Sequence, residues 1–468
     1  MIATLLFFVT VIGIGLLLDP FFAHMHRLER LGLAILCGSV LLPFLLFFAS
    51  AYLHILPLAK TGVGVFFRSG VTVLALASIA RFLLSEIRAL RAPGRSRSAP
   101  RKKRRVQISV MISTLSLIAF AFFVVIGIHT RLFGWDEYSY WMYAAKVLTV
   151  TGGDIHALLP NAYGSYPPGF PELAAWNDAL QGDVSIQHAK WMAPLYFLGA
   201  LTLEWGLFKR YQTSTSRILI ILALTVWGCQ SYDLFTILAY GEMPYVDLYT
   251  PGVIYLAFSM RSKDMRDLNT GVILLLFSAF LRVDGWIVAG FTLVLFFLFN
   301  ARQVLTAVRA KKRLLAYACA ALPILLWNLY LLHHPTLAGW GTRLTLSRVD
   351  ARLPWPFMSR VLGAMWMTVS NLRVSPIMAV YPLLIGYALV KRNRALWFLL
   401  AVVLTQFAYL FTAYMTVFSS FEALHASSLD RYLLRVDPLI SAGLFFALYD
   451  EKTTRVWATM SQARRRAG

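Results

Sequence analysis

The chain has 468 residues, of which 59% are hydrophobic and only 14% are charged, and its formal net charge is +22. Soluble domains carry about 25% charged residues, so this chain has too few polar side chains to cover the surfaces of soluble domains. Its mean hydropathy is +0.65. A set of soluble globular domains is therefore excluded, and the sequence predicts an integral membrane protein.

Long apolar runs predict α-helices that cross the membrane. About 20 apolar residues in a helix span the roughly 30 Å hydrocarbon core, whereas membrane β-barrels show short alternating segments. The most apolar runs are residues 2–18, 31–56, 108–128, 218–227, 285–299 and 395–418. We therefore expect an all-α polytopic membrane protein.

The basic residues predict the orientation of the chain. The connectors richest in Lys and Arg are 88–105, 209–217, 261–266, 302–313 and 391–394, together with the C-terminal tail. Such connectors stay in the cytoplasm by the positive-inside rule. The remaining connectors then face outward, at residues 129–190, 236–248, 333–372 and 417–432. The alternation predicts about thirteen membrane helices, with the N-terminus outside and the C-terminus inside.

We divide the chain into three parts. Residues 1–105 form three N-terminal helices and a basic linker, 106–450 form the main membrane module, and 451–468 form a basic cytoplasmic tail. Residues 269–301 have basic connectors on both sides. The chain must therefore leave the cytoplasmic side of the membrane and return to it within about 30 residues. Two short helices that meet near residues 282–285 would satisfy this requirement.

The basic surplus also attracts anionic membrane lipids. Nucleic acid is not an expected partner, because the charges are scattered over connectors that flank membrane helices and no nucleic-acid module surrounds them.

The outward loop at residues 129–190 is too long for a simple connector. Asp136 and Glu137 follow a predicted membrane helix. The next residues predict an amphipathic helix that ends near Gly152, and Asp136 and Tyr140 lie on the same face of it. Such a helix should lie along the membrane surface. There the Asp136 carboxylate could accept a proton from an incoming hydroxyl, and Glu137 could tune it or bind a second substrate group. Capping of the helix by Asp136 is the alternative.

The same loop continues through Tyr166-Pro167-Pro168-Gly169. This segment must be extended or turned, because proline fixes φ and restricts the residue before it. A second short helix should begin near Pro171. Two surface helices joined by a rigid turn would form a shelf over the membrane, and a merely structural loop is the alternative.

The outward loop at residues 333–372 contains His333, His334, Trp340 and Arg343. No further ligands at metal-binding spacing accompany the paired His, so we predict no metal site there. The basic and aromatic side chains would suit an anionic glycan or a lipid headgroup. We expect Trp340 and Arg343 to contribute to acceptor recognition.

In their order along the chain, these features resemble the GT-C superfamily of membrane glycosyltransferases, which use sugars on polyprenyl phosphate carriers. Protein O-mannosyltransferases, lipid A aminoarabinose transferases and lipopolysaccharide glycosyltransferases belong to it. The acidic pair followed by a surface helix and YPPGFP is similar to the superfamily's first outward loop. Arg282 matches the basic residue at the tip of its paired short helices, and Asp284 matches the acid that often follows. In SSLDRYLLRVDPL, Arg431, Tyr432 and Pro438 match the start of its last helix.

The resemblance covers roughly residues 108–450 and implies a GT-C-like fold with amphipathic juxtamembrane helices in the first large periplasmic loop. It implies an inverting glycosyltransferase of lipopolysaccharide or polysaccharide biosynthesis in the cell envelope, in a bacterial inner membrane with its active site facing the periplasm. The partners would be a polyprenyl-phosphate-sugar donor and a lipid-linked or glycan acceptor. Asp136 would act as general base, with Glu137 beside it.

The resemblance also implies that basic residues at the outer boundary hold the donor phosphate. The candidates are Arg431, Arg435 and Arg282. Arg431 and Arg435 are four residues apart on a helix and face the same way, and the guanidinium fork suits a phosphate. Pairing of these two arginines with Asp430 and Asp437 is the alternative.

The substrate-binding candidates are Tyr140, Tyr166, Glu242, Asp247, Trp340 and Arg343. The chain departs from the superfamily in three ways. Three extra helices precede the catalytic module, the second outward acid is ambiguous between Glu242, Asp247 and Asp233, and Arg435 stands where the family commonly has proline. Some members use a divalent metal at their acids, so metal dependence stays open, and no other cofactor is expected.

Two rival functions remain at this stage. A polysaccharide polymerase or ligase also acts on lipid-linked sugars, but it relies on Arg and His in a late, large loop. A transporter of lipid-linked glycans would have internal repeats and a site at the membrane midplane.

Overall fold

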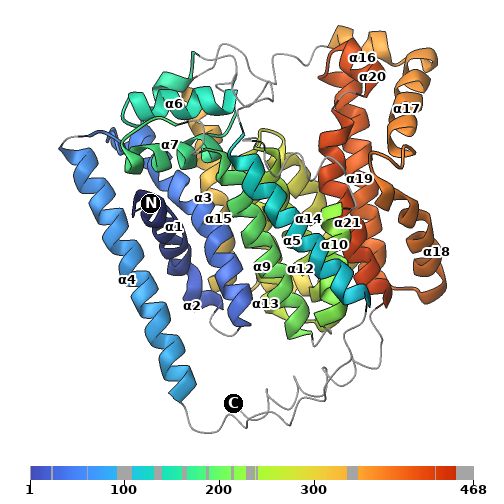
Figure 1. The fold of residues 1–468 in the computed structure, drawn as a ribbon. Helices are drawn as coiled ribbons and strands as arrows, with labels where there is room; N and C mark the ends of the chain where they lie inside the picture. The colour runs from blue at the N-terminus through green and yellow to red at the C-terminus, as the bar shows by residue number, and fades with distance from the viewer. Residues whose placement is uncertain are drawn as a thin grey trace.

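The computed structural model describes residues 2–22, 25–60, 62–91, 108–130, 140–160, 166–185, 189–211, 215–227, 238, 241–334, 346–426 and 428–448. All regular elements in these ranges are helical, which confirms the all-α prediction (Figure 1). The elements are α1 (Ile2–Gly15), η1 (Leu16–Leu18), α2 (Asp19–Phe22), α3 (Arg27–Leu53), α4 (Val63–Arg91), α5 (Ile108–Ile128), α6 (Met142–Val150), η3 (Ile155–Leu158), α7 (Gly169–Gln181), α9 (Met192–Arg210), α10 (Thr215–Trp227), α12 (Glu242–Ser262), α13 (Met265–Ser278), η4 (Ala279–Leu281), α14 (Gly285–Val308), α15 (Lys311–His333), α16 (Leu346–Arg352), α17 (Trp355–Val369), η6 (Pro376–Val380), α18 (Tyr381–Lys391), α19 (Arg394–Thr416), α20 (Ser420–His425) and α21 (Leu429–Leu448).

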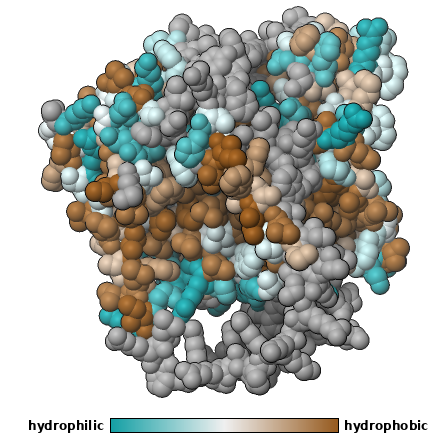
Figure 2. Space-filling view, in the orientation of Figure 1, coloured by the Kyte–Doolittle hydropathy of each residue, from teal (hydrophilic) through white to brown (hydrophobic). Residues whose placement is uncertain are grey.

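Six helical segments within the described ranges are long and apolar enough to cross a membrane: Ile2–Phe22, Arg27–Leu53, Val63–Arg88, Gly285–Val308, Lys311–His333 and Arg394–Thr416. Figure 2 shows a band of hydrophobic residues across the middle of the molecule, with most hydrophilic residues above it. A lipid bilayer is the solvent that suits such a band. The chain is therefore an α-helical membrane protein, and the count of about thirteen helices stays a prediction.

The N-terminal helices pack tightly on the rest of the bundle. α1 packs on α3 and α4, and α3 packs on α9. A Cβ at Gly38 would lie 1.9 Å from the Val11 carbonyl oxygen, and a Cβ at Gly15 would lie 1.8 Å from that of Ala34. Glycine therefore allows the close crossing of α1 and α3, as small residues do between membrane helices.

The segments predicted to face outward gather at one end of the bundle. α6 and α7 lie at the upper left of Figure 1, and α16, α17 and α20 lie at the upper right. The C-terminal ends of α4 and α9 lie at the opposite end. This arrangement supports the predicted alternation of basic and outward connectors.

The helical pair predicted at residues 269–301 is present. α13 continues through η4, the chain is extended at Arg282 (φ −141°, ψ 147°), and α14 begins at Gly285. α14 also leaves helical geometry at Asn300 (φ −146°, ψ 42°). Two helical segments therefore meet at residues 282–284, where the basic flanks predicted, but α14 has 24 residues and is longer than the short helix that was expected.

A buried polar cluster joins four helices near the other end of the bundle. The carboxylate of Glu29 in α3 accepts hydrogen bonds from Tyr255 of α12 at 2.6 Å and pairs with Arg210 of α9 at 3.1 Å. Arg210 also pairs with Asp267 of α13, which accepts a hydrogen bond from Tyr211 at 2.6 Å. These contacts fix the ends of α3, α9, α12 and α13 to one another.

The predicted orientation can be tested by thiol labelling. Lys146 in α6 and Lys312 in α15 are both exposed and lie on connectors predicted to face opposite sides. In a variant without Cys37, Cys229 and Cys319, we expect Lys146→Cys to react with a membrane-impermeant maleimide in intact cells. Lys312→Cys should react only after the membrane is permeabilised, and labelling of both without permeabilisation would contradict the orientation.

Candidate functional site

A buried ionic cluster lies where the α13–α14 break meets α12 and α21. The carboxylate of Asp284 accepts a hydrogen bond from Arg282 Nε at 2.7 Å and from Arg435 Nη2 at 3.0 Å. Arg282 Nη1 donates to Glu242 Oε1 at 2.5 Å. The exposed fractions are 8% for Arg282, 7% for Asp284, 7% for Glu242 and 1% for Arg435. Two guanidinium groups and two carboxylates are therefore held together in the protein interior.

Two tyrosine rings enclose Arg435. Its guanidinium carbon lies 4.2 Å from the centre of the Tyr432 ring and 4.7 Å from that of the Tyr245 ring. Cation–π contacts of this kind are worth about 2 kcal/mol when the cation is desolvated. The rings therefore offset part of the cost of burying the charge.

Some polar atoms of this cluster have no hydrogen-bond partner among the residues that the structure describes. They are Arg435 Nη1, Glu242 Oε2 and the Tyr245 hydroxyl. A buried polar atom without a partner costs about 1–3 kcal/mol. Such a site suits a polar ligand that would form hydrogen bonds with these unpartnered donors and this acceptor.

Local structure explains how these side chains meet. The extended backbone at Arg282 ends one helical segment, and Asp284 stands at the N-cap of α14. Glu242 occupies the first turn of α12, where the helix dipole favours a carboxylate. Arg435 lies almost two turns into α21, and Tyr432 precedes it by three residues on the same face.

A second polar chain runs from the cluster along α12. The rings of Tyr245 and Tyr249 are stacked with their centres 5.4 Å apart. The Tyr249 hydroxyl hydrogen-bonds with Thr292 Oγ1 of α14 at 2.7 Å and accepts from Gln406 Nε2 of α19 at 2.7 Å. The cluster is thus connected to Tyr249 by ring stacking, and Tyr249 is connected to α14 and α19 by hydrogen bonds.

The arginines keep Asp284 ionised. Both guanidinium groups donate hydrogen bonds to its carboxylate oxygens, and a buried carboxylate stays charged when it is paired in this way. Asp284 is therefore an anchor for the guanidinium groups.

The shelf predicted from the first outward loop lies against the segments that carry this cluster. Tyr140 is buried, with its ring centre 4.5 Å from that of Trp141 and 5.0 Å from that of Tyr166. A Cβ at Gly241 would lie 2.4 Å from the Trp141 ring, and a Cβ at Gly169 would lie 3.1 Å from the Phe280 carbonyl oxygen. Gly241 precedes Glu242, and Phe280 precedes Arg282 by two residues, so both shelf helices touch segments that carry the cluster.

The structure agrees with several details of the shelf. α6 ends at Val150, and Gly152 and Gly153 follow with φ angles of +73° and +91°, which favour glycine. α7 begins at Gly169, two residues before the predicted start. Tyr140 and Tyr166 are parts of a packed aromatic cluster, so they position the shelf as well as being candidates for substrate contact.

The structure brings Arg282, Arg435 and Glu242 together, but it separates Asp247 from them. Asp247 is buried on α12, and its charge acts on Tyr196 of α9. Arg431, at the start of α21, is close enough for its charge to act on Glu242. Of the two second-loop acids that the structure describes, Glu242 therefore belongs to the arginine cluster.

Arg435 does pair with an acid, but not with either acid considered from the sequence. Its partner is Asp284, 151 residues away in the chain. Asp437 instead accepts two hydrogen bonds from the Ser375 hydroxyl at 2.9 Å. The alternative of an ion pair between Arg435 and Asp430 or Asp437 is therefore replaced by an ion pair with Asp284.

Four predicted site residues lie outside the described residues: Asp136, Glu137, Trp340 and Arg343. Asp233 lies outside them too. Their predicted roles stay predictions.

Among the residues that the structure describes, no group of three or more His, Cys, Asp or Glu side chains could hold a metal ion. His334 packs against Tyr330 and His156, with ring centres 4.7 Å and 4.9 Å away. The Tyr330 hydroxyl and His156 Nδ1 are hydrogen-bonded at 2.8 Å. The described surroundings of His334 are therefore those of a packed aromatic side chain.

Sequence reasoning missed Tyr245 and Tyr249 as site residues. Their spacing of three and seven residues from Glu242 puts them on the same helix face, which was the available signal. Gln406 was missed as well, and nothing in its local sequence marks it, because its partner Tyr249 is 157 residues away.

Comparison of the chain with protein-family models, with curated proteins and with solved structures finds no match. The likeness to the GT-C superfamily stays a prediction.

The ionic cluster predicts a large stability effect at Asp284. Asp284→Asn removes the charge that neutralises two buried guanidinium groups, and breaking such a pair costs about 3–5 kcal/mol. We expect unfolding of the purified protein at a lower SDS concentration or temperature than the unsubstituted chain. Asp264→Asn is the matched control, because Asp264 is a partly exposed N-cap bonded to Arg266 N at 3.0 Å and asparagine caps helices equally well. Equal effects of the two substitutions would contradict a central role for Asp284.

Proposed function

We propose that the protein is a membrane glycosyltransferase that moves a sugar from a polyprenyl-phosphate donor to a lipid-linked or glycan acceptor. The observation that carries the proposal is the pair of buried arginines, Arg282 and Arg435, held by Asp284 beneath the outward shelf. Arg435 Nη1 and the Tyr245 hydroxyl are buried donors without an acceptor in the described part of the chain. A phosphate oxygen would complete them.

Arginine suits this task better than lysine. Its planar fork binds one anion with one edge while the other edge stays free for a second anion. Arg435 uses Nη2 for Asp284, which leaves Nη1 for a phosphate. Positive charge fixed beside the leaving phosphate lowers the energy of the transition state, and such stabilisation is among the largest contributions to catalysis.

The proposed reaction is a single displacement at the anomeric carbon. The acceptor hydroxyl gives its proton to the Asp136 carboxylate and its oxygen forms a bond to that carbon. The bond between the carbon and the phosphate oxygen breaks, and its electron pair leaves on polyprenyl phosphate, where the arginines balance the new charge. The proton on Asp136 then passes to solvent, and the configuration at the anomeric carbon is inverted.

The shelf supports the proposed role of Asp136. Tyr140, four residues after Asp136 in the sequence, packs with Trp141, whose ring touches Gly241 next to Glu242. The base would thus come from a segment anchored beside the arginine cluster. The predicted orientation makes this the periplasmic face of a bacterial inner membrane, and cell-envelope glycans are the corresponding products.

The proposal is tested by donor consumption. Purified protein is incubated with a panel of polyprenyl-phosphate sugars and a lipid extract as acceptor, and release of polyprenyl phosphate is measured. We expect one donor to be consumed and Asp136→Asn to slow its consumption by about a hundredfold or more. Asp350→Asn, an exposed acid in α16, is the control and should leave the rate unchanged. Unchanged transfer in Asp136→Asn would rule out its role as base.

A second variant separates phosphate binding from folding. Arg435→Lys keeps a positive charge beside Asp284 but loses the planar fork, so we expect normal expression and unfolding temperature with a donor KM raised about tenfold. Arg360→Lys, an exposed arginine in α17, should change neither quantity. If Arg435→Lys leaves donor KM unchanged, Arg435 does not bind the donor.

A further inference from the structure

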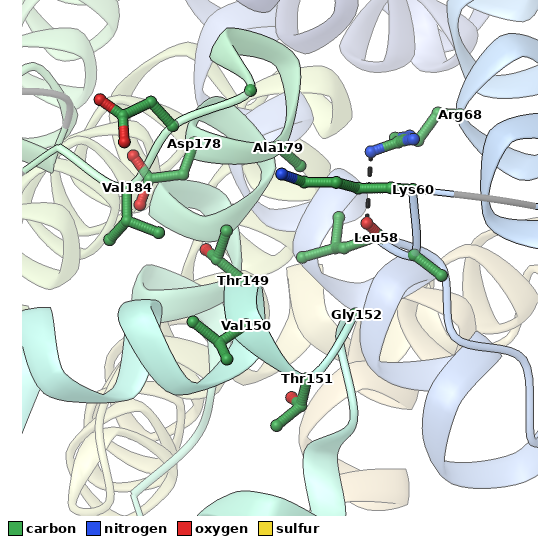
Figure 3. A pocket seen from close by; sticks show the side chains of 13 residues that line it. Leu58, Lys60, Arg68, Thr149, Val150, Thr151, Gly152, Asp178, Ala179 and Val184 are labelled. Carbon is green, nitrogen blue, oxygen red and sulfur yellow. Dashed lines mark hydrogen bonds between the residues drawn. The ribbon is translucent and has the colours of Figure 1, made fainter.

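A pocket of about 490 Å³ opens at the outward end of the bundle, apart from the arginine cluster. It is formed by residues 58–60 and Arg68 from the N-terminal unit, by the C-terminal end of α6, and by the C-terminal end of α7 with the residues that follow it (Figure 3). The N-terminal unit and the shelf, which are far apart in the sequence, therefore line one cavity.

Backbone contacts fix these two parts together. Leu58 N donates a hydrogen bond to Gly152 O at 2.8 Å, and Ile155 N donates to Ser50 Oγ at 3.0 Å. A Cβ at Gly153 would lie 3.0 Å from the Pro57 ring. The pocket is thus a built feature of the junction between the N-terminal unit and the shelf.

The walls of the pocket carry opposite charges. Lys60 and Arg68 come from one side, and Asp178 comes from α7 on the other side, with Asp183 after it (Figure 3). Arg68 Nη1 is bonded to the Leu58 carbonyl oxygen at 3.2 Å, and Asp178 accepts a hydrogen bond from Ser185 N at 3.3 Å. A ligand that fits both walls carries an anionic group and a cationic group close together.

Apolar side chains beside the pocket point to a ligand with a hydrocarbon part. Val150, which lines the pocket, is 71% exposed. Val65, three residues before Arg68 on α4 and so on the same side of the helix, is 42% exposed. Such exposed apolar residues beside charged ones are typical of the membrane boundary.

We propose that this pocket binds a phospholipid whose headgroup joins a phosphate to a primary ammonium group, as in phosphatidylethanolamine. Lys60 and Arg68 contact the phosphate, and the exposed Asp183 accepts a hydrogen bond from the ammonium group. The acyl chains lie along the exposed apolar face of α4. The proposal goes beyond glycosyl transfer and does not depend on it.

The lipid would also act on the position of the shelf. The N-terminal end of α7 touches η4 through Gly169, and ten residues further its C-terminal end lines the pocket. At 1.5 Å per residue the two ends of this helix are about 15 Å apart. A lipid in the pocket therefore holds the helix whose other end contacts the segment leading to Arg282.

The test is native mass spectrometry of the full-length protein with three lipids that have the same acyl chains. We expect phosphatidylethanolamine to be retained about fivefold better than phosphatidylglycerol, which lacks the ammonium group, and than phosphatidylcholine, whose ammonium has no N–H donor. Equal retention of the three lipids would overturn the proposal.

Two exposed side chains allow matched variants. Lys60→Gln should weaken retention of all three lipids about fivefold, whereas Asp183→Asn should weaken only that of phosphatidylethanolamine. Lys146→Gln and Asp350→Asn, which do not line the pocket, are the controls for the two charge changes. Unfolding temperatures of all four variants should match the native chain. If the pocket variants retain the lipids as the controls do, the pocket is not the binding site.

Discussion

The shared carboxylate of Asp284 is the interaction on which the interior of the molecule depends. It neutralises Arg282 at the break between α13 and α14 and Arg435 on α21, while Glu242 of α12 completes the pairing of Arg282. Buried ion pairs have little net value compared with apolar packing, but removing one partner is costly. Such an arrangement fixes helix positions and is expensive to retain without a function.

The broken helix and the shelf have a common consequence. Arg282 and Asp284 at the break are buried, and Trp141 and the start of α7 pack against the segments that carry Glu242 and Arg282. Irregular backbone at membrane depth is tolerated only where protein or a polar cavity surrounds it. The packing of the shelf against these segments thus surrounds the broken pair with protein.

Sequence reasoning succeeded where a local physical rule applied. Basic flanks on both sides of residues 269–301 required a return within the membrane, and the break occurs at residues 282–284 as predicted. Deep arginines are functional candidates by default, and Arg282 and Arg435 do meet. The choice of partner could not be predicted, because Asp284 and Arg435 are brought together by the packing of α12 against both α14 and α21 rather than by spacing. Glu242 and Asp247 lie on different faces of the same helix, so packing also decides that Glu242 pairs with Arg282 and Asp247 does not.

The three extra N-terminal helices acquire a structural role through α7. The buried Trp176 donates a hydrogen bond to Thr10 Oγ1 of α1 at 3.1 Å, and Gln181 donates to Thr4 Oγ1 at 2.9 Å. α7 also packs on α3. Because α1 and α3 cross closely through Gly15 and Gly38, they form a rigid support for this helix. The N-terminal unit therefore holds α7 against the segments that carry the ionic cluster.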